Sequence, residues 1–183
     1  MGILGAAPAP GPQETVRVVL TRAGAIVTGG GSHDERLASL KSLTRDLLDT
    51  DTMGRRAMGP VLASRPEAEQ AEFLELFEEL IVRAYLQKLL FFRNPEFVYG
   101  DETIEGGTAT VNTRIRTSRD DFYVDYELRL RGSEWVATDV IVEHASLTRN
   151  YHRQFARLLE AESFEELLDR LRGKLRHLRD DSE

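Results

Sequence analysis

The feature that most constrains the fold is a central block, residues 96–142, in which apolar and polar residues alternate. Its clearest stretch has apolar side chains at every second position, namely Phe122, Val124, Tyr126, Leu128 and Leu130. Successive side chains of a strand point to opposite faces, so this stretch predicts a strand with one buried and one solvated face. Turn residues divide the block into four segments, which predict an antiparallel meander with strands at residues 96–104, 108–117, 122–131 and 135–142.

Helical periodicity lies on both sides of this block. The predicted helices cover residues 14–27, 34–48, 55–62, 66–91, 147–160 and 164–178. The fourth helix carries an apolar stripe wider than one buried face requires, so we expect it to be covered on more than one side or to border a cavity. Helices before and after a sheet predict an α+β fold, in which helices cover one face of a four-stranded antiparallel sheet.

The length of 183 residues fits a single domain. We expect a flexible N-terminal segment at residues 1–13, the domain at 14–178 and a short tail at 179–183. The N-terminal segment is too short and too rich in proline for an intact signal peptide, but its small residues resemble the segment that follows a signal cleavage site. Export is therefore left open by the sequence, and no apolar run is long enough for a transmembrane helix.

Composition excludes several classes of function. The formal net charge of -7 argues against a nucleic-acid-binding protein, because phosphate contacts need a basic surface. There are no cysteines, and the four histidines have no spacing that puts two imidazoles on one helical face, so we expect no metal site. Protein partners and neutral or apolar ligands are favoured instead.

A cluster of Glu143, His144 and Ser146 looks at first like a hydrolase triad. The period changes from two to about 3.6 residues at Ser146, which places its hydroxyl where a helix N-cap belongs. Glu143 and His144 are also consecutive in a strand, so they point to opposite faces. The cluster therefore predicts a structural corner, and we expect no catalytic residue.

One acid leaves an enzymatic alternative open. Asp139 could be a general base in a cone-shaped α+β fold of the isomerase type, with Tyr126 or Tyr151 as proton donor. The simpler interpretation is an acid that is hydrogen-bonded to the backbone at the edge of the sheet, because buried polar groups are usually satisfied structurally.

Two motifs resemble the MlaC, or toluene-tolerance, family of periplasmic phospholipid-binding proteins. The predicted long helix carries the first motif, with Phe73, Phe77, Leu80, Arg83 and Tyr85. The second spans a strand, a cap and a helix face, with Trp135, Asp139, Val142, Glu143, Ser146, Asn150, Tyr151, Gln154 and Phe155. His144 and His152 depart from the family pattern, which usually has Gly and Arg at these positions.

The resemblance implies an NTF2-like or cystatin-like curved sheet whose helices enclose an apolar cavity. It implies a soluble, monomeric, non-enzymatic carrier of the periplasm that needs no cofactor and holds phospholipid as cargo. Its partners would be an inner-membrane ABC transporter with an MCE-domain protein and an outer-membrane lipoprotein and porin complex, which together maintain outer-membrane lipid asymmetry. A small-molecule isomerase or hydrolase-like enzyme, a hopanoid-associated lipid-binding protein and a pure interaction module remain alternatives.

Two sets of residues are candidates for these roles. Lipid contact is predicted for Phe73, Phe77, Leu80, Ala84, Val111, Trp135, Ile141, Tyr151 and Phe155, although aromatic residues at helical spacing are more often ordinary core. Docking of an acidic partner is predicted for three arginines aligned on one helix, Arg149, Arg153 and Arg157. The same arginines could equally be a solvated helix face. Two acyl chains would require a cavity near or above about 1,000 Å³.

Overall fold

The computed structural model describes residues 9–180. Most of the predicted N-terminal segment and the last three residues of the predicted tail lie outside the described residues. The helices are α1 (Pro12–Thr28), α2 (His33–Thr44), α3 (Thr50–Met58), α4 (Pro60–Ala63), α5 (Glu67–Ile81), the π-helical turn η1 (Val82–Leu86), α6 (Gln87–Leu89), α7 (Leu147–Leu159) and α8 (Phe164–Asp180). The strands are β1 (Glu96–Glu105), β2 (Thr108–Arg116), β3 (Asp121–Arg131), β4 (Glu134–Val142) and β5 (Ala145–Ser146).

The sheet has five strands in the order β1-β2-β3-β4-β5, and every neighbouring pair is antiparallel. The predicted α+β class and meander are confirmed, but the predicted number of four strands is wrong. After β4, Glu143 and His144 both adopt positive φ, as the central pair of a type I′ hairpin turn does. The chain therefore folds back, and Ala145 pairs with Val142 before α7 begins.

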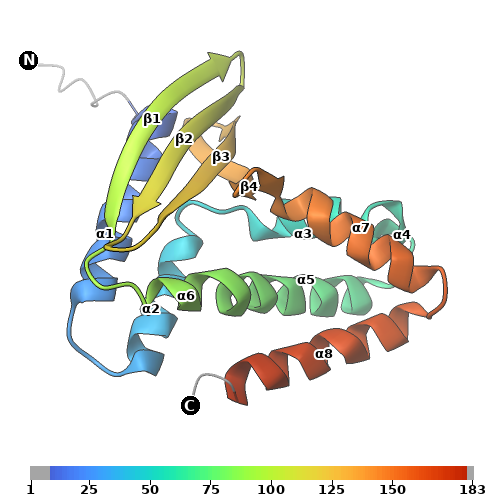
Figure 1. The fold of residues 1–183 in the computed structure, drawn as a ribbon. Coiled ribbons are helices and arrows are strands. Elements are labelled where there is room, and N and C mark those ends of the chain that lie inside the picture. Colours follow the sequence, from blue (N-terminus) through green and yellow to red (C-terminus); the bar gives the residue numbers. More distant parts are fainter. Residues whose placement is uncertain (1–8, 181–183) are drawn as a thin grey trace, which may run out of the picture.

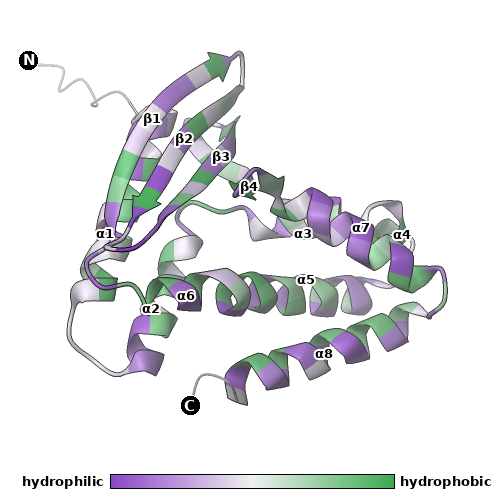
Figure 2. Ribbon diagram, viewed as in Figure 1, coloured by the Kyte–Doolittle hydropathy of each residue, from purple (hydrophilic) through white to green (hydrophobic). Residues whose placement is uncertain are grey.

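Alternation along the strands gives the sheet one buried face. On β2, Ala109, Val111, Thr113 and Ile115 are buried, and the residues between them are not. Figure 2 shows the same alternation of hydrophilic and hydrophobic residues along the strands. The predicted dry face of β3 is confirmed from Val124 to Leu128, whereas Leu130 at its far end is 40% exposed.

The helices divide into two groups (Figure 1). α1 lies along the sheet and contacts β1 and β2, and α2 packs against α1 and η1. α5 lies in a second group, where it contacts α3 and α8, while α7 contacts α3 and β4. The predicted long helix is thus α5, η1 and α6 in succession, and the expectation that it is covered on more than one side is confirmed. No helix among residues 9–180 is long and apolar enough to cross a bilayer.

Tertiary contacts end α2 earlier than its sequence pattern predicts. Residues beyond Thr44 leave the helix and run beside β4, where Leu48 forms a parallel bridge with Ala137. The Ala137 N–H donates to the Leu47 carbonyl at 2.7 Å, and the Asp49 N–H donates to the Ala137 carbonyl at 2.9 Å. These bonds satisfy backbone groups at a bulge in β4, so pairing with the sheet replaces the last helical turn.

Candidate functional site

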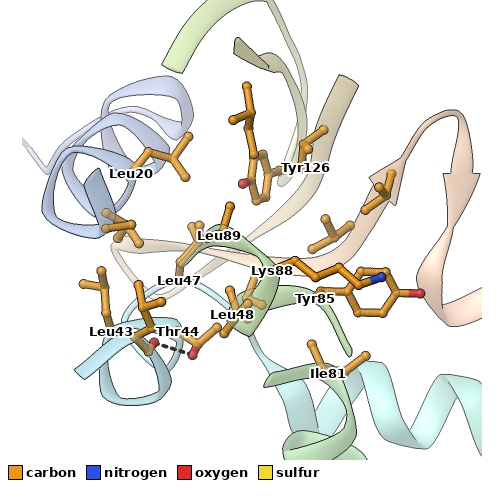
Figure 3. A pocket seen from close by; sticks show the side chains of 18 of the residues that line it. Leu20, Leu43, Thr44, Leu47, Leu48, Ile81, Tyr85, Lys88, Leu89 and Tyr126 are labelled. Atoms are coloured by element: carbon orange, nitrogen blue, oxygen red, sulfur yellow. Dashed lines mark hydrogen bonds between the residues drawn. The ribbon is translucent and has the colours of Figure 1, made fainter. Parts of the chain in front are cut away.

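An apolar cavity of about 360 Å³ lies between the inner face of the sheet and the helices α1, α2, η1 and α6. Figure 3 shows Leu20 of α1, Leu43 of α2 and Leu89 of α6 around one space together with Tyr126 of the sheet. The cavity is lined by Val19, Leu20, Ala23, Leu40, Leu43, Thr44, Leu47, Leu48, Ile81, Tyr85, Leu86, Lys88, Leu89, Phe92, Phe97, Ile115, Phe122, Val124, Tyr126, Val140, Val142 and Leu147.

The lining follows from the local structure of each element. α1 contributes Val19, Leu20 and Ala23, which share one face of that helix. From β3, Phe122, Val124 and Tyr126 arrive at alternate positions and so project from the same face of the sheet. The floor of the cavity is therefore sheet, and its walls are helix.

The π-helical turn η1 orients the side chains that form the remaining wall of the cavity. A π turn holds one more residue than an α turn and so rotates everything that follows it relative to α5. Ile81 precedes the turn, Tyr85 and Leu86 lie within it and Leu89 follows it, yet all four line the cavity. π turns of this kind occur frequently at functional sites.

Polar groups in the lining are few and mostly satisfied. The Thr44 hydroxyl donates within its own helix to the carbonyls of Leu40, at 2.9 Å, and Lys41, at 2.8 Å. Burial raises the pKa of the Tyr126 phenol well above its ordinary value, so this side chain is neutral at pH 7. The interior of the cavity thus presents hydroxyl groups but no buried charge.

Among the described residues that line the cavity, Lys88 is the only charged one, and its side chain is exposed. Its Nζ lies 5.7 Å from the centroid of the Tyr85 ring, within range of a cation–π contact. The Tyr85 phenol in turn is hydrogen-bonded to that of Tyr151, whose pKa is raised by burial and by this neighbour. Lys88 and Tyr85 lie side by side in Figure 3 and mark the polar end of the cavity.

None of the nine residues predicted to contact lipid belongs to this lining. Phe73, Phe77, Tyr151 and Phe155 form an aromatic cluster between α5 and α7, with ring centroids 5.6 to 6.4 Å apart. Of the other five, Leu80 and Val111 are fully buried. Ala84, Trp135 and Ile141 are half-buried. Their contact with a lipid stays a prediction, and the lining residues are the stronger candidates.

Sequence reasoning missed α1 and α2 as parts of the wall. The signal was present in the apolar stripe of α1, but a stripe shows only that a helix face is buried and not what it faces. Which side chains border open space depends on the distance between α1 and α6, and that distance is a tertiary property.

The corner after β4 is structural, as predicted. Ser146 caps α7, because its Oγ accepts from the Arg149 N–H at 3.1 Å. The same hydroxyl donates to the Asp139 carboxylate at 2.5 Å. The His144 ring instead stacks on that of Tyr123, with centroids 5.6 Å apart, so the triad components do not converge.

Asp139 is buried and accepts several hydrogen bonds at this corner. Besides Ser146, the Thr148 hydroxyl donates to it at 2.7 Å and the Thr148 N–H at 3.1 Å. The Val140 N–H adds a bond at 2.8 Å. A carboxylate with these partners fixes the start of α7 to the sheet, in agreement with the structural interpretation of this acid.

The predicted docking arginines are exposed on α7. Arg149 and Arg153 line a surface hollow, and Arg157 lies one turn farther along the helix, outside that lining. Among residues 9–180, no three histidine, aspartate or glutamate side chains gather in a geometry that could hold a metal ion.

The structure is that of an α+β domain with an apolar cavity between its sheet and its helices. The chain belongs to the MlaC family, since the family model described as MlaC protein matches residues 17–173. The fold is also that of a phospholipid-binding protein from Ralstonia solanacearum, solved in complex with a phospholipid at 1.53 Å resolution. The two chains are 19% identical with a TM-score of 0.82, and the match covers 94% of this chain and 99% of the other. A search of curated proteins finds no match.

Proposed function

We propose that this protein is a non-enzymatic lipid carrier that binds phospholipid acyl chains in its apolar cavity. The observation that carries the proposal is the lining itself, which contains no carboxylate and, apart from Lys88, no charged side chain. Each methylene group removed from water contributes about 0.8 kcal/mol, so an acyl chain gains strongly from such a lining. Family membership and the lipid bound by the Ralstonia protein of the same fold support this cargo.

The lipid head group is expected to stay at the end of the cavity marked by Lys88. A phosphate inside the lining would lose its hydration without gaining a counter-charge, which costs several kcal/mol. At the polar end, the exposed Lys88 ammonium offers a positive charge that remains in contact with water. The cavity therefore selects for the chain of a lipid and leaves its head group in solvent.

The cavity volume bears on how many chains it holds. At about 360 Å³, it is smaller than the roughly 1,000 Å³ expected for two chains. We therefore expect a single chain to occupy it, and a second chain would require α1 and α2 to move away from η1 and α6.

We further propose a periplasmic shuttle that exchanges phospholipid between two membrane complexes. One is an inner-membrane ABC transporter with an MCE-domain protein, and the other is an outer-membrane lipoprotein and porin complex. A membrane interior is as apolar as the cavity, so loading and unloading can be nearly balanced in free energy. The carrier is expected to act as a monomer.

The enzymatic alternative finds no support in the cavity. General acid–base chemistry would need a titratable carboxylate within reach of a bound substrate. Asp139 instead serves the corner between β4 and α7, on the other side of the strand from Val140. A hopanoid lipid remains an alternative cargo.

Native mass spectrometry of the protein purified from a bacterial host tests the proposal. A co-purifying glycerophospholipid is expected, and tandem fragmentation identifies its head group and chains. A co-purifying hopanoid would instead identify the alternative cargo. Protein that stays free of lipid after incubation with phospholipid vesicles would contradict lipid carriage.

A further inference from the structure

A hollow of about 460 Å³ lies on the surface between α3, α7 and the outer face of the sheet. We call it the arginine hollow, because Arg56 of α3 and Arg149 and Arg153 of α7 line it. His152 and Glu127 complete its rim, with Asp139 and Thr148 at its base. Nothing in the lipid cavity requires these side chains.

The two α7 arginines are available to a ligand. Neither Arg149 nor Arg153 forms a side-chain ion pair with any residue that the structure describes, and both side chains are exposed. Other surface arginines do form such pairs, as Arg45 does with Glu78 and Arg55 with Asp51, both at 2.8 Å. What distinguishes Arg149 and Arg153 is that they lie one helical turn apart on α7 and line the same hollow.

Hydrogen bonds to neighbouring backbone and side-chain groups orient the other two basic residues of the hollow, Arg56 and His152. Arg56 donates through Nη1 to the carbonyl and the hydroxyl of Thr138, both at 3.2 Å. His152 lies 3.1 Å through Nδ1 from the Ala57 carbonyl, so Nδ1 carries the proton. These bonds orient both side chains at the rim without neutralising a charge.

The balance of charge in the hollow is positive, although the chain carries a net charge of -7. Three guanidinium groups face two carboxylates, and that of Asp139 is buried and already accepts hydrogen bonds from Ser146, Thr148 and Val140. Those neutral donors leave the Asp139 charge in place, and the half-buried Glu127 adds a second negative charge, so the three arginines exceed the carboxylates by one charge. A local positive field on an acidic protein attracts negatively charged groups and keeps out other surfaces.

We propose that the arginine hollow docks an acidic segment of a partner protein. Guanidinium groups bind carboxylates through two parallel hydrogen bonds, and a concave site admits a peptide carrying several of them. A membrane surface fits less well, because strong binding at an interface adds the insertion of apolar side chains to the attraction between opposite charges. Among residues 9–180, the exposed large apolar side chains are Val18, Val61, Phe91, Ile104, Tyr123 and Leu130, and none of these lines the hollow.

The hollow is also the reverse side of the lipid cavity wall. Asp139 and Thr148 line the hollow, and their chain neighbours Val140 and Leu147 line the cavity. A partner segment in the hollow would thus contact the same strand and helix start that enclose the cargo. This position suits a partner that receives or delivers the lipid.

The test uses fluorescence anisotropy of a labelled decaglutamate peptide with the full chain. The double variant Arg149→Gln/Arg153→Gln removes the two unpaired charges, and Arg93→Gln/Arg119→Gln removes two exposed charges elsewhere as the matched control. We expect the first variant to bind the peptide about tenfold or more weakly and the control to bind like the unmodified protein. Affinity should also fall as ionic strength rises.

Two further measurements keep the outcome decisive. Thermal melting verifies that both double variants are folded, and the single variant Arg153→Lys, which keeps the charge but not the paired hydrogen bonds, should fall between them in affinity. Phospholipid uptake should be unchanged, which separates this proposal from lipid binding itself. The proposal is overturned if the peptide does not bind, if both double variants bind it equally, or if the arginines are needed only for binding to phosphatidylglycerol vesicles.

Discussion

Asp139 and Val140 are consecutive residues of β4 that serve opposite sides of one wall. Val140 lines the apolar cavity, whereas the Asp139 carboxylate is buried on the other side and accepts hydrogen bonds from Ser146 and Thr148. The wall of the cavity is therefore fixed by a polar network outside it. Stability of the corner and capacity for lipid should be separable by mutation.

Removal of the Ser146 hydroxyl tests the corner. Ser146→Ala removes a helix cap, worth about 0.5 to 2 kcal/mol, and also one donor to a buried carboxylate, worth about a further 1 to 3 kcal/mol. Ser163→Ala is the matched control, because the Ser163 hydroxyl accepts from the Glu166 N–H at 3.3 Å but has no buried carboxylate to satisfy. Urea unfolding should show a larger loss for Ser146→Ala, with lipid uptake retained. Equal losses would mean that the bond to Asp139 contributes nothing.

Two tryptophan substitutions, one on α5 and one on α6, distinguish the cavity from the core. Leu80 is fully buried outside the lining, so Leu80→Trp should overpack the core and lower stability by about 1 to 3 kcal/mol. Leu89 lines the cavity, so Leu89→Trp should fill open space, with a smaller loss of stability and a lower lipid capacity. Melting of delipidated protein and phospholipid retained after reloading measure the two effects. If Leu80→Trp blocks loading without destabilising the fold, the cavity extends to the face predicted from the sequence.

Alkaline pH tests the burial of Tyr126. Burial raises the folded-state pKa of its phenol above the ordinary value of 10.0, so above pH 10 the unfolded chain loses a proton that the folded chain keeps. Stability should therefore be intact below pH 10 and fall as pH rises, by up to about 1.4 kcal/mol per pH unit from this group. Urea unfolding of Tyr126→Phe across this range should show a shallower fall. A slope equal to that of the unmodified protein would show that Tyr126 reaches water.

Lys88 is expected to contribute to head-group preference. Because its ammonium is exposed, Lys88→Ala should weaken the binding of anionic phosphatidylglycerol only about two- to fivefold and leave phosphatidylethanolamine nearly unaffected. The exposed Arg119 lies outside the lining, so Arg119→Ala is the control. Competition between the two lipids, read by native mass spectrometry, gives the ratio. An equal loss for both lipids would place the head group away from Lys88.

Local patterns determined the elements of this protein. Alternation together with the turn residues predicted β1 to β4, and the position of Ser146 before an apolar period predicted the start of α7. The short strand β5 escaped prediction, since it depends on two residues other than glycine adopting positive φ at Glu143 and His144. The end of α2 escaped too, because pairing of Leu48 with Ala137 joins residues far apart in sequence.

The site was decided by tertiary structure. Phe77 and Tyr85 lie eight residues apart on one predicted helix, and their sequence pattern gives both to a buried stripe. In the structure, Phe77 packs in the aromatic cluster and Tyr85 lines the cavity, with the π turn Val82–Leu86 between α5 and the residues that follow. Periodicity in the sequence predicts that a side chain is buried. Whether it then meets another side chain or open space depends on how far apart the helices and the sheet are held, and only long-range packing sets that distance.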